Sequence, residues 1–67
     1  MFYKEKLKKR MEELDMLQID LCRKSGVQPG HLCRIYNGGI IYPRQKVVAK
    51  IAQALDVNES YFYSNEP

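Results

Sequence analysis

The sequence is poor in the residues that hold metal ions or disulfides. Its 67 residues include two cysteines, Cys22 and Cys33, one histidine, His31, and no CxxC pair. A structural zinc site needs about four such ligands, so a metal site at His31 and Cys33 is disfavoured and no cofactor is expected. Both cysteines are interpreted as free thiols.

Long apolar runs are also missing. No window approaches the roughly 18 apolar residues of a membrane span, and residues 1–10 carry charges but lack the apolar stretch of a secretory signal. These absences predict a soluble protein of the reducing cytoplasm. Residues 1–67 are expected to form a single domain, which at this size buries only about 60% of the surface that the unfolded chain exposes.

Groupings of catalytic residues are absent as well. The sequence shows no nucleophile beside a base, no convergent pair of carboxylates and no glycine-rich phosphate loop. A small helical domain also offers little room for a substrate pocket. An enzyme is therefore not expected.

Acidic residues are missing from the middle of the chain. The segment from Leu21 to Leu55 contains no aspartate or glutamate. It holds six basic residues: Arg23, Lys24, Arg34, Arg44, Lys46 and Lys50. This asymmetry is typical of a surface that meets a polyanion, although a solvated face with scattered charges explains it equally well.

Apolar spacing predicts two helices in the first part of the chain. One apolar stripe of the first helix consists of Tyr3, Leu7, Met11 and Leu14. The charged residues interleaved with acids on this helix are interpreted as a solvated face: Lys4, Lys6, Lys8, Lys9 and Arg10. A second helix is predicted over 18–25, where Gly26 can take a positive φ and end it.

The third helix is predicted from Pro29 to about Asn37. Pro29 fits the first helical position because its fixed φ suits that place and its missing N–H would be unpaired there. Leu32 and Ile35 are expected to point inward. Gln28 stands at the N-cap, a position that glutamine fills poorly.

Two further helices complete an all-α domain of five helices. Pro43 is expected to open the fourth helix, and Asn58 to cap a last short turn. The apolar face of the fourth helix consists of Val47, Val48, Ile51, Ala52 and Leu55. No strand pattern is present.

The order of these features resembles the helix-turn-helix of the lambda-repressor-like proteins, also called the Cro/repressor or XRE type. Counted from Gln18, the residues that carry the resemblance are Leu21, Cys22, Gly26, Val27, Leu32 and Ile35. The resemblance continues through NGG after the third helix and through VAKIAQALDVNESYF, residues 48–62, so it covers nearly the whole chain. It implies a compact five-helix domain and a transcriptional regulator, a repressor, that binds double-stranded DNA sequence-specifically and usually as a dimer.

The resemblance also implies which residues read DNA. Family members read bases mainly from the first, second and sixth residues of the recognition helix, which here are Pro29, Gly30 and Arg34. Pro29 can touch a thymine methyl and Gly30 allows close approach of the backbone, but neither side chain can donate a hydrogen bond. Arg34 is therefore the expected guanine reader, with Gln28 and His31 beside it.

Phosphate contacts are assigned to three other residues. Gln18 lies at the start of the second helix, where free amide groups already favour an anion. Arg44 and Lys46 follow the loop after the recognition helix. Because a domain of this size touches one half-site, a symmetric homodimer is expected on DNA, in contact through the loop 40–42 and the segment 57–63.

The chain departs from the family pattern at four positions, one of which is Gln28, where a serine or threonine often precedes the recognition helix. Family members often pair an arginine on the first helix with a glutamate near the end of the recognition helix, where this chain has Met11 and Tyr36. Because both charges are absent together, no charge is stranded, and Met11 is expected to pack on Tyr36. Leu17 replaces the usual serine or threonine before the second helix, which removes a cap.

The two thiols are expected to differ. Cys22 lies where the second and third helices cross closely, which predicts a small buried side chain. Cys33 follows the inward Leu32 and should lie on the outer side of the recognition helix.

One alternative function stays open. An antitoxin that blocks a toxin, or another protein-binding adaptor, could use the same fold with weak DNA specificity. Pro29 and Gly30 favour this alternative because they cannot read bases by hydrogen bonds. The acid-free middle of the chain argues against it.

Overall fold

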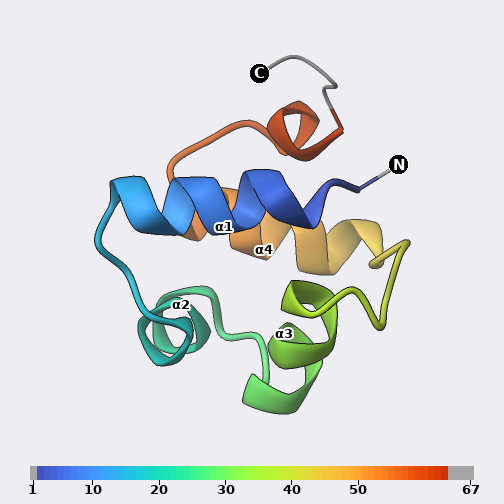
Figure 1. The fold of residues 1–67 in the computed structure, drawn as a ribbon, viewed down its shortest axis with the longest axis horizontal. Helices are drawn as coiled ribbons and strands as arrows, with labels where there is room; N and C mark the ends of the chain where they lie inside the picture. Colours follow the sequence, from blue (N-terminus) through green and yellow to red (C-terminus); the bar gives the residue numbers. More distant parts are fainter. Residues whose placement is uncertain (1, 64–67) are drawn as a thin grey trace.

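The computed structural model describes residues 2–63, which form four α-helices and one 3₁₀ helix (Figure 1). In chain order these are α1 (Lys4–Glu13), α2 (Gln18–Ser25), α3 (Pro29–Tyr36), α4 (Gln45–Ala54) and η1 (Glu59–Phe62). In Figure 1, α2 and α3 lie on one side of α1 and α4, and η1 lies on the other. The all-α fold is confirmed, except that the fifth predicted helix is a single 3₁₀ turn.

An apolar core joins all five helices. No polar or charged side chain is buried among the described residues. The largest fully buried side chains are Leu7, Leu21, Leu32, Ile35, Val48, Ile51, Leu55 and Phe62. Since every helix contributes to this set, detaching any one helix would expose part of the core to solvent.

The segment before α1 closes onto η1. Tyr3, expected within the first helix, has extended backbone (φ −98°, ψ 104°), and its N–H donates to the carbonyl oxygen of Phe62 at 2.9 Å. Phe2 is buried instead and stacks on Phe62 with the ring centroids 5.1 Å apart. The prediction for Tyr3 is wrong because helical periodicity does not reveal where the first turn begins.

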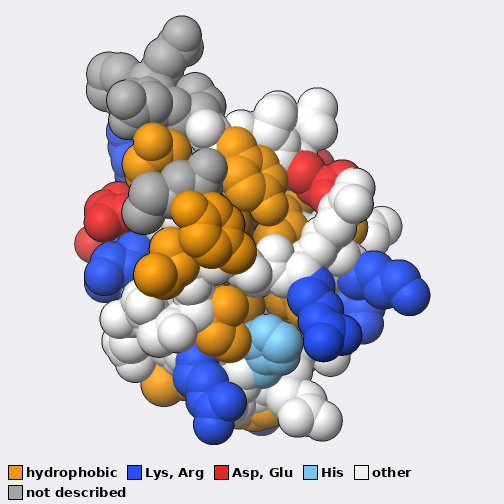
Figure 2. Space-filling view, turned by 90° about the vertical axis from the view of Figure 1, so that its right-hand side faces the viewer, with side chains coloured by type: hydrophobic (Ala, Val, Ile, Leu, Met, Phe, Trp, Pro, Cys, Tyr) orange, Lys and Arg blue, Asp and Glu red, His pale blue; other side chains and the backbone are white. Residues whose placement is uncertain are grey.

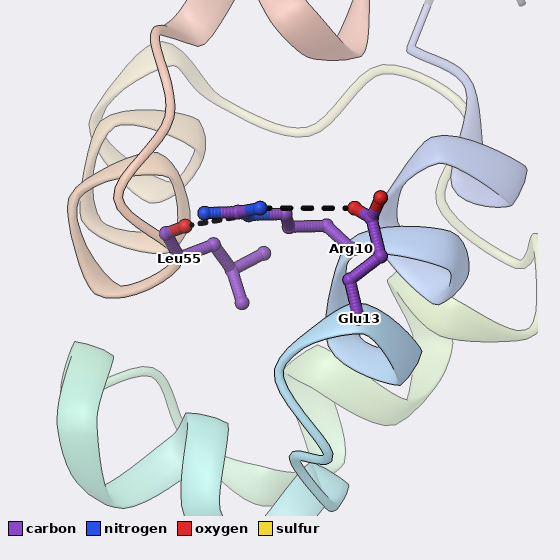
Figure 3. Close-up of polar contacts among 3 residues, drawn as sticks. All are labelled: Arg10, Glu13 and Leu55. Atoms are coloured by element: carbon purple, nitrogen blue, oxygen red, sulfur yellow. Dashed lines mark hydrogen bonds and ion pairs between the residues drawn. The ribbon is translucent and has the colours of Figure 1, made fainter.

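Arg10 is not part of a solvated face, as the sequence had suggested. Its Nε donates to the carbonyl oxygen of Leu55 at 2.9 Å, and its Nη1 lies 3.7 Å from the carboxylate of Glu13 (Figure 3). Leu55 directly follows α4, where carbonyl oxygens have no partner within the helix. Arg10 thus links α1 to the C-terminal end of α4, the end at which a positive charge is favourable.

The start of α4 and the cap of η1 also differ from expectation. Pro43 was expected to open the helix, but Arg44 is extended at the N-cap (φ −65°, ψ 149°), so α4 begins at Gln45. Pro43 is buried before it. Asn58 precedes η1 as predicted, yet its side chain makes no capping hydrogen bond.

Three helices end in the same left-handed motif. After α1, α3 and α4, one N–H bonds back three residues and the next bonds back five. After α1, the N–H groups of Asp15 and Met16 donate to the carbonyl oxygens of Glu12 and Met11. The corresponding donors and acceptors are Gly38 to Ile35 and Gly39 to Arg34 after α3, and Asp56 to Gln53 and Val57 to Ala52 after α4. They satisfy carbonyl oxygens that the helix ends leave free. α1 ends at Glu13, so Leu14 is the C-cap and not part of the helix. Leu14 is therefore not buried with the apolar stripe of α1 and is 39% exposed.

The residue with positive φ in this motif is glycine only once. Gly38 fills the position after α3 with φ 85°, whereas Asp15 (φ 52°) and Asp56 (φ 57°) fill it after α1 and α4. The left-handed conformation is unfavourable for an L residue, by about 1 to 2 kcal/mol in general, though aspartate tolerates it better than most. Each carboxylate also lies at the negative end of a helix dipole.

Replacing either left-handed aspartate by glycine should therefore stabilise the protein. We expect Asp15→Gly and Asp56→Gly each to raise the free energy of unfolding by about 0.5 to 1 kcal/mol, since glycine removes both the backbone strain and the charge. Urea titration followed by circular dichroism measures this change.

Asp20→Gly is the matched control. Asp20 lies in the first turn of α2, where its carboxylate accepts the N–H of Leu17 at 3.1 Å and so replaces part of the cap that Leu17 lacks. The same substitution should here lower the free energy of unfolding by about 1 to 2 kcal/mol. Equal signs for all three variants would contradict this account.

The two thiols occupy different environments, as predicted. Cys22 is buried and Cys33 is exposed. Burial raises the pKa of the Cys22 thiol, which lowers its reactive thiolate fraction at neutral pH. Iodoacetamide should therefore modify Cys33 much faster than Cys22 in the native protein, and both at similar rates in denaturant. Equal rates in the native protein would show that Cys22 is reached by solvent.

Candidate nucleic-acid interface

The turn between α2 and α3 holds the two helices of the motif at a fixed angle. Gly26 has φ 80°, as predicted, and its N–H donates to the carbonyl oxygen of Cys22 at 2.9 Å. The Ser25 hydroxyl donates to the carbonyl oxygen of Leu21 at 2.6 Å and accepts the N–H of Val27 at 3.2 Å. The buried Val27 then anchors the entry to α3.

α3 presents one side to the core and the other to solvent. Leu32 and Ile35 are fully buried, which confirms their inward orientation. The predicted bounds hold within one residue, because α3 ends at Tyr36 and Asn37 is its C-cap. Gln28 occupies the N-cap without a side-chain capping hydrogen bond.

The expected base-reading residues lie on the solvent side of α3. Pro29, Gly30 and Arg34 are exposed, and His31 is half-buried. Gly30 and Arg34 are four residues apart and therefore share one face of the helix. The fold thus leaves the outer face of α3 free for a partner.

The cations of the acid-free segment are all exposed. Among residues 2–63, none of the six makes an ion pair with an acidic side chain: Arg23, Lys24, Arg34, Arg44, Lys46 and Lys50. Figure 2 shows the face on which the loop after α3 lies. Its acidic side chains are in the upper half, while the lower half around the histidine carries Lys and Arg. A polyanion could approach this lower part without meeting a carboxylate.

The loop from α3 to α4 connects the expected base reader to the expected phosphate contacts. The N–H groups of Gly39 and Ile40 donate to the carbonyl oxygen of Arg34 at 2.8 Å and 3.3 Å. At the other end of the loop, Arg44 is the N-cap of α4 and Lys46 is the second residue of that helix, both exposed.

Gln18 has neighbours that the sequence did not indicate. It is half-buried at the start of α2 and lines a surface hollow together with Lys8 and Tyr36. The ammonium of Lys8 lies 4.8 Å from the centroid of the Tyr36 ring. Asp20 exposes a carboxylate in the same turn of α2, which opposes an anion at Gln18. Of these neighbours, only Asp20 could have been found from the local sequence, because an acid three residues after the N-cap often completes a capping box. Lys8 and Tyr36 lie too far away in the chain for such a signal.

The predicted contact between Met11 and Tyr36 stays a prediction. Met11 is buried in the core, and Tyr36 is half-buried and packs against the same core. Both side chains line the hollow beside Gln18. The structure adds Lys8 over the tyrosine ring as a second partner.

Apolar side chains gather on the face shown in Figure 2. The ring of Phe2 lies 6.1 Å from that of Tyr63, and Phe2 also lines a hollow with Ile40 and Ile41. The exposed fractions of Ile41, Tyr42 and Tyr63 are 52%, 75% and 43%. We call the surface formed by Ile40, Ile41, Tyr42 and Tyr63 around the buried Phe2 the apolar patch. It joins the loop 40–42 to the end of the segment 57–63, the two regions expected at a dimer contact.

Two further features concern the described residues as a whole. Within residues 2–63, no group of three or more His, Cys, Asp or Glu is placed to hold a metal ion. No helix in this part of the chain has the length and apolar character needed to cross a bilayer.

Comparison with known proteins places the motif in a family. A helix-turn-helix family model matches residues 7–62, from within α1 to the end of η1. No curated protein and no solved structure gives a significant match. The matched residues include α2, the left-handed turn at Gly26 and α3. The chain therefore belongs to the helix-turn-helix family, in its XRE or lambda-repressor-like form.

Proposed function

We propose that this protein is a transcriptional repressor that binds double-stranded DNA sequence-specifically, with α3 in the major groove. The family match supports a DNA-binding helix-turn-helix domain. The observation that carries the proposal is the set of exposed cations, unpaired among residues 2–63, on the acid-free segment that contains α3. In this proposal residues 1–67 provide one DNA-binding domain, which acts in the cytoplasm.

Arg34 is the principal base reader in this proposal. It is exposed in the last turn of α3, and a guanidinium can donate to O6 and N7 of a guanine together. Pro29 and Gly30 contribute shape, because neither side chain can donate a hydrogen bond. Gln28 and His31 flank this surface.

The phosphates are held from α4 and α2. Arg44 and Lys46 place two positive charges at the start of α4. Gln18 is a weaker contact, because Asp20 in the same turn repels a phosphate. Such contacts fix the position of the domain on DNA but carry no sequence information.

Alanine variants of Arg34 and Arg44 distinguish a contact that reads a base from a contact that positions the protein on phosphate. Arg34→Ala should lower affinity for a selected site by roughly 1 to 3 kcal/mol and remove the preference at one guanine. Arg44→Ala should weaken selected and scrambled DNA alike and reduce the salt slope by about one contact. Fluorescence anisotropy on both DNAs at several salt concentrations measures this contrast.

Two results would contradict the proposal. If Arg34→Ala loses the same factor on both DNAs, then Arg34 contacts only phosphate. If the unmodified protein shows no salt-dependent binding to duplex DNA, an antitoxin or another protein-binding adaptor on this fold is favoured instead.

We further propose that the protein binds DNA as a symmetric homodimer through the apolar patch. Exposed Ile41 and Tyr42 are costly to leave in water and lie at the loop that follows the recognition helix. A two-fold contact there would set two α3 helices against half-sites about 10 base pairs apart, one helical turn.

Ile41→Gln tests the dimer without changing the charge of the DNA-binding surface. Because Ile41 is about half exposed in the free subunit, removing its apolar contact from both subunits should cost on the order of 1.5 to 3 kcal/mol in total and weaken self-association at least tenfold. Sedimentation equilibrium measures the association, and footprinting shows whether protection falls from two half-sites to one.

Ile19→Gln is the matched control. Ile19 is 49% exposed, close to the 52% of Ile41, but lies on α2 and outside the apolar patch. It should leave association unchanged. If both variants remain as dimeric as the unmodified protein, the apolar patch is not the dimer contact.

A further inference from the structure

Two surface hollows of opposite charge meet beside α4. The first lies between the end of α2 and α4, and its charged residues are Lys24 and Lys50. The second lies between α4 and η1, and its charged residues are Asp56 and Glu59. Gln53 lines both hollows, so they share an edge. We call the surface formed by these five residues the charged face, with a basic half and an acidic half.

The four charges of this face are free to meet a partner. Lys24, Lys50 and Asp56 are exposed, and Glu59 is half-buried. Among residues 2–63, none of the four makes an ion pair. A face that carries both signs side by side is complementary to a copy of itself. A two-fold axis between its halves would set the basic half of each subunit against the acidic half of the other.

The charged face lies away from the surfaces assigned to base reading and to the dimer. None of the residues that line its two hollows belongs to α3 or to the apolar patch. In Figure 1 the loop that leads into α4 is on the right, and the chain leaves α4 on the left. A dimer joined through the apolar patch therefore keeps a charged face uncovered on each subunit.

We propose that the charged face joins two dimers bound at neighbouring sites on one DNA, with a second copy of this chain as the partner. The proposal rests on the proposed function, because it requires both DNA binding and the dimer at the apolar patch. Symmetric dimers in a row turn identical faces toward each other, which is the arrangement that a self-complementary face needs. Exposed ion pairs are individually weak, but proteins already held on one DNA meet at a high effective concentration.

The test compares DNA that carries one selected site with DNA that carries two, separated by spacers of increasing length. At one favoured spacing, the second dimer should bind about tenfold more tightly than the first, as expected for a few exposed ion pairs formed together. This cooperativity factor should fall toward one as salt is raised, because salt screens exposed charges. Footprinting titrations of both sites measure the factor.

Charge reversals identify the residues that pair. Lys50→Glu and Glu59→Lys each place like charges opposite one another across the two-fold axis, so each should abolish cooperativity. The double variant K50E/E59K restores opposite charges and the original net charge, and should recover most of the factor. Dividing by the single-site affinity of the same variant removes the effect of its charge on DNA binding.

Lys9→Glu is the matched control. Lys9 is exposed on α1 and lies outside the charged face. This variant changes the net charge as Lys50→Glu does, but should leave the cooperativity factor unchanged. Binding of each variant to the single site shows that it is folded.

Three results would overturn the proposal. If the unmodified protein shows no cooperativity at any spacing, a second copy is not the partner of this face. If cooperativity survives both single reversals, the contact between dimers lies elsewhere. If the double variant is no more cooperative than the single ones, the two residues do not pair. In all three cases the proposed function stands, provided that the unmodified protein binds its single selected site as a dimer. Absence of that binding would overturn the proposed function itself.

Discussion

The left-handed turn at Gly26 is the constraint on which the candidate interface depends. With φ 80°, it turns the chain within the three residues between α2 and α3, so that the buried sides of both helices meet in one core. A Cβ there would touch nothing within 4 Å, so the backbone conformation alone, and not crowding, requires glycine. Because the core fixes Leu32 and Ile35, the residues between them are forced outward. The exposure of Arg34 follows from the packing of its neighbours.

The ends of the helices show where acidic residues are tolerated. Asp15 and Asp56 take strained positions after α1 and α4, where glycine would be more stable, while Gly38 takes the equivalent position after α3. The consequence is that the end of α3, the helix with the proposed base-reading surface, carries no carboxylate. The region around α3 thus keeps a charge distribution that suits a polyanion. The ends of α1 and α4 are less stable than they would be with glycine at these positions.

Much of the fold could be predicted from the sequence, because its signals are local. Apolar spacing identified the buried residues of α3 and most of those of α4, although it missed Ala54, and the family resemblance indicated Leu21 and Cys22 of α2. Gly26 and Pro29 marked the turn with the correct backbone roles. The missed contacts join residues far apart in the chain, such as Phe2 with Phe62 and Arg10 with the carbonyl oxygen of Leu55. No periodicity encodes these pairs. For the candidate site, the sequence predicted which side chains are exposed, but their roles depend on the geometry of a bound duplex.

If the protein binds DNA as the proposed dimer, the small number of base-reading side chains gives the contact between the subunits a direct part in specificity. With one arginine as the proposed base reader per domain, a single half-site provides only about 1 to 3 kcal/mol per good contact, which places the expected specificity near the lower end of the 10³ to 10⁷ range. In a symmetric dimer each contact is made twice, so the discrimination factors of the two half-sites multiply. In the proposed dimer, the apolar patch would contribute to sequence selection without touching a base, because it would hold the second reading surface at a fixed spacing from the first.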